Sequence, residues 1–384
     1  IILPRKDHII DLIITHYHRF YCHTGPYQLM SLLRQKYWIL SARRIIRNIT
    51  SKCNYCFKFK PKSNDPLMGN LPSSRVNVSR AFEHSAVDYA GPLEVTLRRQ
   101  RGERRHKVYI CVFVCLCTRA VHVELADDLS SNSFLNAFKR FISRRGSVKH
   151  LYSDNGTNFV GAKGYLSDLF KFLENNFKEP LCNELNRCRI QWHLNPPRSP
   201  HFGGHYEIYI TSFKTHLYRV IGQQLLSKDE LYTLLIQIEA ILNSRPLTLL
   251  SEDPSEPAAL TPAHFLMSAP LTYLPAYDVS NEPISVANRF GLINNMVQGF
   301  WKRWRLEYLH LLQSRSKWNT PANPITVGSV VLIVTDNVPP VCWPLGIISA
   351  VHPGADGVVR VASVRTSSGT YKRPVVRLCT LPSQ

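Results

Sequence analysis

Three acidic residues lie in sequence contexts that could bring them together in a folded chain. Asp88 lies in Val87-Asp-Tyr-Ala-Gly-Pro92, Asp154 in Ser153-Asp-Asn-Gly-Thr-Asn-Phe159, and Glu207 in His201-Phe-Gly-Gly-His-Tyr-Glu207. Mg²⁺ prefers carboxylate oxygens and keeps coordination positions for phosphate oxygens. Two such ions about 3.5–4 Å apart activate a water or hydroxyl and neutralise charge during phosphoryl transfer. The three acids therefore predict a site for two Mg²⁺ or Mn²⁺ ions.

Each acid also has a purely structural explanation. Asp154-Asn-Gly is a favourable turn sequence, and Asp88 precedes Gly91-Pro92, where it could cap a turn. Lys214 lies two helical turns beyond Glu207 on the same expected helix face, and we expect it to contact a phosphate. For any single acid, the residues alone leave both interpretations open.

A second group of residues has a spacing that is typical of zinc ligands. His18 and His23 are five residues apart, and Cys53 and Cys56 form a Cys-x-x-Cys pair thirty residues further on. Two nitrogen and two sulfur ligands suit tetrahedral Zn²⁺. His16 could replace His18, and Cys22 offers a further sulfur. A unit this small buries little apolar area, so the metal would contribute directly to its folding.

The hydrophobic pattern indicates which elements position these residues. Residues 1–60 read as helical, with Ser41 as the expected N-cap of a helix that starts at Ala42. The following region predicts three strands, then a helix, a strand, a helix, a strand and a helix, which is a mixed α/β layer fold. The expected ranges are strands within 81–126, a helix at 130–145, a strand ending at 152, a helix near 161–177, a strand at 189–194 and a helix from 206 to 221.

Proline-rich stretches and turn sequences divide the chain further. A helix is expected near 296–312, and Trp301, Trp304 and Tyr308 on it have the spacing of a packed helix face. Short strands separated by Asp356-Gly357 and Ser368-Gly369 predict a small antiparallel, barrel-like domain. The predicted organisation is a helical zinc-binding domain at 1–62, a linker at 63–80, a catalytic core at 81–250, a connector with a helix at 251–320, and a basic β domain at 321–384.

The charge of the chain predicts a polyanionic partner. Its 384 residues include 47 Lys and Arg against 27 Asp and Glu, a net charge of +20 that is concentrated in the first 80 and the last 84 residues. Such fields attract phosphate backbones. No uncharged apolar run is long enough for a membrane span, and ten irregularly spaced cysteines favour a reducing, intracellular location. The residues expected to contact nucleic acid are Lys214, Arg98, Arg99, Arg101, Arg360, Arg365, Lys372 and Arg373.

Five motifs in order resemble the integrases of retroviruses and long-terminal-repeat retrotransposons, in particular the BEL/Pao group. They are the histidine pair, the Cys-x-x-Cys pair, VDYAGP (87–92), SDNGTNF (153–159) and HFGGHYE (201–207). TRAVHVEL (118–125), LNSRPLT (242–248) and WPLGII (343–348) are also similar to that group. The resemblance covers essentially the whole chain.

This resemblance implies a ribonuclease-H-like core in which Asp88, Asp154 and Glu207 are the catalytic metal ligands, with Asp88 bridging two ions. It implies one Zn²⁺ on His18, His23, Cys53 and Cys56. Similar enzymes trim the 3′ ends of element DNA and join them to target DNA. The implied partners are double-stranded DNA and further copies of the chain, and the implied location is the nucleus. The chain is expected to be one piece of a polyprotein.

The sequence departs from the BEL/Pao pattern at one notable position. Tyr206 stands before Glu207, where this group commonly has tryptophan. Two other interpretations stay open, namely a non-catalytic copy that binds nucleic acid and a related metal-dependent nuclease or transposase. The presence of all three acids argues against the first, and the zinc-ligand spacing and the group-specific tail argue against the second.

Overall fold

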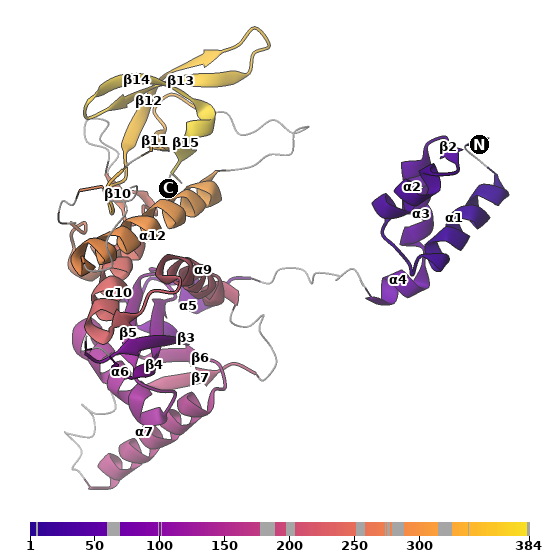
Figure 1. Cartoon of the computed structure of the whole chain (residues 1–384). Coiled ribbons are helices and arrows are strands. Elements are labelled where there is room, and N and C mark those ends of the chain that lie inside the picture. Colours follow the sequence, from indigo (N-terminus) through magenta and orange to yellow (C-terminus); the bar gives the residue numbers. More distant parts are fainter. Residues whose placement is uncertain are drawn as a thin grey trace. The chain divides into compact units, whose positions relative to one another are not determined.

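The computed structural model describes residues 1–4, 7–59, 70–98, 100, 102–176, 189–196, 204–250, 258–272, 274, 277–278, 288–313, 325–336 and 338–381. The chain divides into two compact units, Ile1–Asn70 and Leu71–Gln384 (Figure 1). Among the described residues, no helix combines the length and the apolar character that crossing a membrane requires.

The first unit is helical, as predicted. Six buried apolar side chains form its core, contributed by α1, α2, α3 and β2: Ile10, Ile14, Leu29, Leu33, Ile39 and Ile46. The elements of this unit are α1 (His8–Phe20), α2 (Pro26–Arg34), α3 (Ala42–Ser51), α4 (Asn54–Phe59) and a short parallel pair, β1 (Ile2–Leu3) and β2 (Trp38–Ile39).

The capping role expected for Ser41 is wrong in part. The helix begins at Ala42 as predicted, but Ser41 has a left-handed backbone conformation (φ 61°) and its side chain makes no capping hydrogen bond. An N-cap side chain reaches the free helix N–H groups from an extended backbone. Ser41 therefore ends a tight turn after β2 and does not cap α3 with its hydroxyl.

A six-stranded mixed sheet is the centre of the second unit. Its order is β5-β4-β3-β6-β7, and β8 pairs with the end of β3. β3 pairs antiparallel with β4 and parallel with β6. The predicted order of three strands, helix, strand, helix, strand and helix is confirmed. These elements are β3 (His84–Thr96), β4 (Arg105–Cys115), β5 (Val121–Ala126), α6 (Ser131–Arg145), β6 (His150–Ser153), α7 (Thr157–Asn176), β7 (Gln191–Leu194) and α9 (Gly204–Ile221). The chain continues with β8 (Leu226–Ser227) and α10 (Lys228–Asn243), which the sequence analysis did not predict.

Helices cover both faces of this sheet (Figure 1). Phe134 of α6 and Phe159 of α7 pack with strand residues such as Phe113 on one face. Apolar residues of α9, α10 and α12 (Arg289–Leu312) pack on the other face. Small elements complete this unit, namely α5 (Ser73–Val76), β9 (Thr248–Leu249), β10 (Ala259–Leu260) and α11 (Pro262–Met267).

Two details differ from the sequence expectations. α7 begins at Thr157 and not near 161, because the Asp154 turn leads directly into the helix. α12 begins at Arg289 and not near 296, because the Asn288 side chain accepts a hydrogen bond from Gly291 N–H and caps it.

The last part of the chain forms a five-stranded antiparallel sheet in the order β14-β13-β12-β11-β15. Its strands are β11 (Val330–Ile333), β12 (Leu345–Pro353), β13 (Val359–Thr366), β14 (Gly369–Pro374) and β15 (Leu378–Thr380), with a 3₁₀ turn at Val375–Arg377. The predicted turns at Asp356-Gly357 and Ser368-Gly369 join β12 to β13 and β13 to β14. Closure of this sheet into a barrel stays a prediction.

A cluster of charged side chains is buried between β5, α6 and α10. Glu239 is 7% exposed; one of its oxygens accepts a hydrogen bond from Val123 N–H at 2.8 Å and the other lies 2.5 Å from Arg145 Nη2. The fully buried His122 ring lies 3.3 Å from Glu239 and 3.1 Å from Glu124. Buried charges are tolerated only when they are paired in this way.

We predict that Glu239→Ala destabilises the second unit by about 3–5 kcal/mol, because it removes a carboxylate partner of the fully buried His122 and of Arg145, whose side chain is 21% exposed. The urea midpoint of unfolding measures this change. Thr233→Ala, at an exposed position of the same helix, is the matched control and should change stability by less than about 0.5 kcal/mol.

The pH dependence of this difference is a further check. Burial opposes ionisation of Glu239, but the hydrogen bond with His122 and the charge of Arg145 outweigh it and lower the pKa of Glu239 below 4.5. A lowered folded-state pKa gives stability that is present above the ordinary value and is lost as the pH falls through the folded value. The gap between wild type and Glu239→Ala should therefore narrow below pH 4.5; an unchanged gap would contradict the role of the charge.

Candidate metal-binding sites

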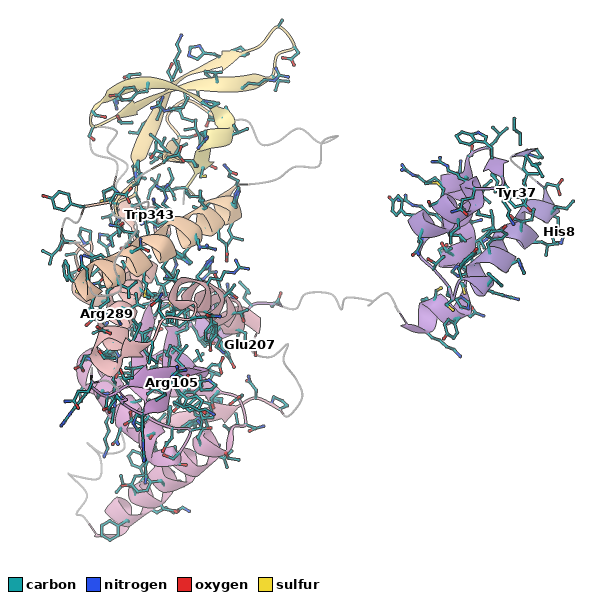
Figure 2. The ribbon with its side chains drawn as sticks, viewed as in Figure 1. His8, Tyr37, Arg105, Glu207, Arg289 and Trp343 are labelled. Atoms are coloured by element: carbon teal, nitrogen blue, oxygen red, sulfur yellow. The ribbon has the colours of Figure 1, made fainter. Side chains whose placement is uncertain are left out.

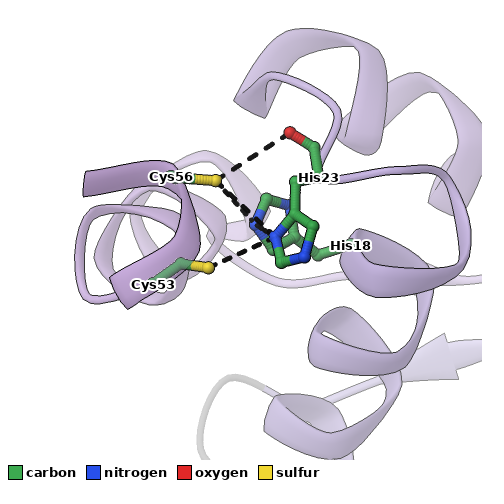
Figure 3. Close-up of side chains that lie close together, drawn as sticks. All are labelled: His18, His23, Cys53 and Cys56. Carbon is green, nitrogen blue, oxygen red and sulfur yellow. Dashed lines mark hydrogen bonds between the residues drawn. The ribbon is translucent and has the colours of Figure 1, made fainter. Parts of the chain in front are cut away.

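The four residues predicted to bind zinc come together in the first unit (Figure 3). His18 Nε2 and His23 Nδ1 are 3.2 Å apart, and the Cys56 sulfur lies 3.2 Å from His18 Nε2 and 3.7 Å from His23 Nδ1. The Cys53 sulfur lies 3.3 Å from His23 Nδ1. Ligands of a tetrahedral Zn²⁺ with bonds of about 2.0–2.3 Å are separated by roughly 3.3–3.8 Å. The donor atoms therefore fit one zinc ion.

Local structure explains why these side chains converge. His18 lies in the last turn of α1, where it is 2% exposed. Cys22 and His23 both have left-handed backbones (φ 52° and 60°), and His23 N–H donates to His18 O at 2.7 Å, which turns the chain back toward the helix. Cys53 immediately precedes α4 and Cys56 lies in its first turn. The backbone thus presents both ligand pairs without further rearrangement.

The protonation states of this group favour metal binding. Burial and the neighbouring His23 lower the pKa of His18, which keeps its imidazole neutral. The backbone N–H of Cys56 lowers the pKa of Cys53 and favours its thiolate. Neutral imidazole and thiolate are the forms that coordinate Zn²⁺. The two alternatives raised by the sequence are not used, because neither His16 nor Cys22 belongs to the cluster and Cys22 is exposed.

The second candidate site contains the three predicted carboxylates. Asp88 lies within the central strand β3, Asp154 follows the parallel strand β6, and Glu207 lies in the first turn of α9 (Figure 2). Asp154 Oδ1 accepts a hydrogen bond from Gly156 N–H at 3.0 Å, so the Asp-Asn-Gly turn expected from the sequence also forms. The structural and the functional interpretations of Asp154 are therefore compatible.

The carboxylates influence one another electrostatically. Burial raises the pKa of Glu207, and the negative charges of Asp88 and Asp154 raise it further. Among the residues that the structure describes, only the four zinc-type ligands have donor atoms that all lie within 4.8 Å of one another. The oxygens of the three carboxylates therefore do not all lie within that distance, although both aspartates are close enough to affect the pKa of Glu207. Their oxygen donors are of the type that Mg²⁺ and Mn²⁺ prefer.

Lys214 makes an ion pair that the sequence did not predict. Its ammonium group lies 2.8 Å from Asp88 Oδ2, so it points toward the carboxylates and forms an ion pair. Both side chains are nearly one-third exposed, at 28% and 29%. The sequence had placed Lys214 beside Glu207 on one helix face, but only the packing of α9 on β3 shows which acid it contacts. A phosphate at this site would lie within reach of the same ammonium group.

Tyr206 shows how the departure from the BEL/Pao pattern is accommodated. The ring is 2% exposed and packs in the core between the sheet and α9. Its hydroxyl accepts a hydrogen bond from Asn195 Nδ2 at 2.6 Å, which satisfies its buried polar atom. Tyrosine therefore fills this position with its ring packed in the core and its hydroxyl hydrogen-bonded.

The described basic residues that were predicted to contact nucleic acid lie on several separate elements, namely α9, the end of β3, and β13 and β14. Arg98 is exposed beyond β3, whereas Arg99 and Arg101 lie outside the described residues. Arg360 makes two contacts with Asp356, at 2.9 and 2.6 Å, which neutralise its charge locally. The strand register places Arg365 and Lys372 on one face of the β13–β14 pair and Arg373 on the other. Arg365 and Lys372 are thus the better candidates in this sheet.

Comparison with protein families identifies two segments of the chain. Residues 6–62 match the family described as "Integrase zinc binding domain", and these residues include all four zinc-type ligands. The match supports an integrase. Residues 288–381, which contain α12 and the five-stranded sheet, match a "Family of unknown function (DUF5641)".

Whole-chain comparisons add little to these matches. No match is found among curated proteins. Among solved structures, the chain is similar to one chain of a cryo-EM structure of the simian T-cell lymphotropic virus intasome in complex with PP2A regulatory subunit B56 gamma. The identity is 13%, the TM-score is 0.31, and the alignment covers 96% of this chain and 99% of the other. A TM-score this low does not indicate a shared fold.

Proposed function

We propose that this chain is the integrase of a BEL/Pao-type retrotransposon, which trims the 3′ ends of element DNA and joins them to target DNA. One observation carries this proposal. A segment that matches the integrase zinc-binding domain is followed, in the same chain, by three carboxylates that β3, β6 and α9 hold within electrostatic reach of one another. In this proposal, the sheet with its helices is a ribonuclease-H-like core and the tail is a small barrel.

The chain's own residues have distinct roles in this reaction. Asp88, Asp154 and Glu207 would hold two Mg²⁺ or Mn²⁺ ions, which activate the attacking hydroxyl or water and neutralise the leaving oxygen when bound. Lys214 balances the charge of Asp88 and can bind a non-bridging phosphate oxygen. Burial and the charges of Asp88 and Asp154 raise the pKa of Glu207, so positive charge bound at this site would favour its ionised form.

The substrate is double-stranded DNA, which the net charge of +20 favours. Arg98, Arg365 and Lys372 are exposed and would contact the phosphate backbone. We further propose that the chain acts as a homo-oligomer, in the nucleus, after release from a polyprotein. Joining two DNA ends to one target requires at least two active sites, which a second copy would supply.

A strand-transfer assay tests this function. The full chain is incubated with Mg²⁺, a labelled duplex that carries the element's terminal sequence, and a target plasmid. We expect labelled DNA to be joined to the plasmid, and EDTA to prevent joining. Salt-dependent DNA binding without joining would favour a non-catalytic nucleic-acid-binding protein, and target cleavage without joining would favour a nuclease. Either result would overturn the proposal.

A further inference from the structure

Helix α12 belongs to the segment of unknown function and packs along α9, the helix that carries Glu207 and Lys214 (Figure 1). Gly299 of α12 lies beside Val220 of α9, and Phe300 packs edge-on against the His216 ring with centroids 5.9 Å apart. Further along α12, Glu307 contacts Ser212. Residue numbers therefore rise on one helix as they fall on the other, and the two helices are antiparallel.

Apolar residues of both helices share one core with the sheet. Phe300, Trp301 and Trp304 of α12 are at most 7% exposed, and they belong to the cluster that contains α9 residues and strand residues. The α9 members are Tyr206, Ile210, Phe213, Leu217 and Ile221. The packing predicted for Trp301 and Trp304 is thus confirmed. The burial of these side chains fixes the distance between α9 and α12. Apolar contacts alone still permit one helix to slide slightly along the other.

A carboxylate of α12 supplies the directional contact. Glu307 Oε1 accepts a hydrogen bond from Ser212 Oγ at 2.7 Å, and Oε2 lies 2.7 Å from His216 Nε2. Ser212 and His216 occupy successive turns of α9, on either side of Lys214 in the sequence. A shift of α9 by one residue would break both contacts. Glu307 therefore fixes the rotation and the axial position of the helix that presents Glu207 and Lys214.

α12 also contacts the five-stranded sheet and the residues that precede its strand β12. Trp301 Nε1 donates to Val338 O at 2.8 Å. Trp343, which is labelled in Figure 2, packs against the rings of Trp301 and Trp304. Leu309 of α12 is buried in the same cluster as the strand residues Val330 and Leu332. Helix and sheet thus form one structural piece, which we call the α12 module (residues 288–381).

We propose that the α12 module positions the catalytic helix α9, with Glu307 as the positioning residue. This inference rests on the proposed integrase function, because it assigns the module a role at the site of that reaction. If the tail acted only as a separately attached DNA-binding domain, no contact from α12 would need to fix the register of α9. The module would instead determine where Glu207 stands relative to Asp88 and Asp154.

The test compares Glu307→Ala, Glu307→Gln and Arg303→Ala in the full chain. Glutamine can still accept from Ser212, but it can donate to His216 Nε2 only if the imidazole proton moves to Nδ1, so its effect should be smaller than that of alanine. Arg303 is exposed on the same helix and serves as the matched control. The two readouts are amide hydrogen exchange of residues 207–217 and the Mg²⁺ concentration that gives half-maximal strand transfer. The first readout requires no activity.

We expect Glu307→Ala to raise both the exchange rate in α9 and the half-maximal Mg²⁺ concentration about tenfold, with unchanged exchange in α6 and unchanged DNA binding. Wild-type values of both readouts in Glu307→Ala would overturn the proposal. The proposal would also be overturned if amide exchange became faster throughout residues 84–243 in both Glu307→Ala and the milder Ser212→Ala. The contact would then stabilise the whole core and not α9 in particular. A wild-type chain that joins no DNA would refute the proposed function, whereas the exchange result would still decide the positioning role.

Discussion

Asp154→Asn is expected to abolish DNA joining, with a loss of about a thousandfold or more. Asparagine keeps the shape of the side chain, and its oxygen can still accept the hydrogen bond from Gly156 N–H that stabilises the turn before α7. The change removes one negative charge from the set formed with Asp88 and Glu207. A metal site stabilises phosphoryl transfer by several kcal/mol, and each 1.36 kcal/mol corresponds to about tenfold in rate. Joined product per unit time is the measurement.

Two comparisons make this result specific. Asp168→Asn removes the same charge from an exposed position on α7, where the side chain is 79% exposed, and should keep wild-type activity. DNA binding by Asp154→Asn should be at least as tight as that of wild type, because a negative charge near the phosphates has been removed. Joining by Asp154→Asn at more than about one-tenth of the wild-type rate would exclude Asp154 as a metal ligand in this reaction.

Cys56→Ser is expected to unfold the first unit while the second unit stays folded. The core of the first unit contains six buried apolar residues, and structural Zn²⁺ contributes an apparent 10–16 kcal/mol (order of magnitude) in zinc-finger peptides. Loss of one sulfur ligand therefore removes the largest single contribution to its stability. We expect the zinc content to fall from one ion per chain to nearly none, and amide protection to be lost across residues 8–51.

The neighbouring residue Cys22 provides the control. It is exposed and lies outside the ligand cluster, so Cys22→Ser should keep one zinc per chain and wild-type amide protection. The strands β3, β4 and β5 should retain their protection in both variants, because they belong to the other compact unit. A Cys56→Ser chain that keeps protected α1 and α3 amides would show that these helices do not need the metal.

Much of the fold follows from local patterns in the sequence. The alternation of strands and helices from 84 to 221 was predictable because each element carries its own hydrophobic period and is bounded by turn residues. The first residues of α7 and α12 were not predictable, because they depend on hydrogen bonds of the Asp154 and Asn288 side chains. The hydrophobic period of a helix does not reveal such bonds. Ser41 is a similar case, because a favourable capping residue is useful only when the preceding backbone is extended.

The zinc-type ligands were predictable for a simple reason. The two histidines are close together in the sequence, and so are the two cysteines. The tertiary structure therefore only has to bring these two pairs together to complete the metal site. The remaining ambiguity between His18 and His16 was resolved by the end of α1, which directs His18 inward. The family match to residues 6–62 agrees with this assignment.

By itself, the sequence determined the identity of the chemically capable residues, the order of the elements that carry them, and the positive charge that predicts a nucleic-acid partner. Only the tertiary structure decided which of these residues meet. Lys214 contacts Asp88 from 126 residues away, and Glu307 reaches Ser212 across 95 residues. Such contacts depend on how helices rotate and pack on a sheet. Many side chains share that packing, and no local pattern in the sequence encodes it.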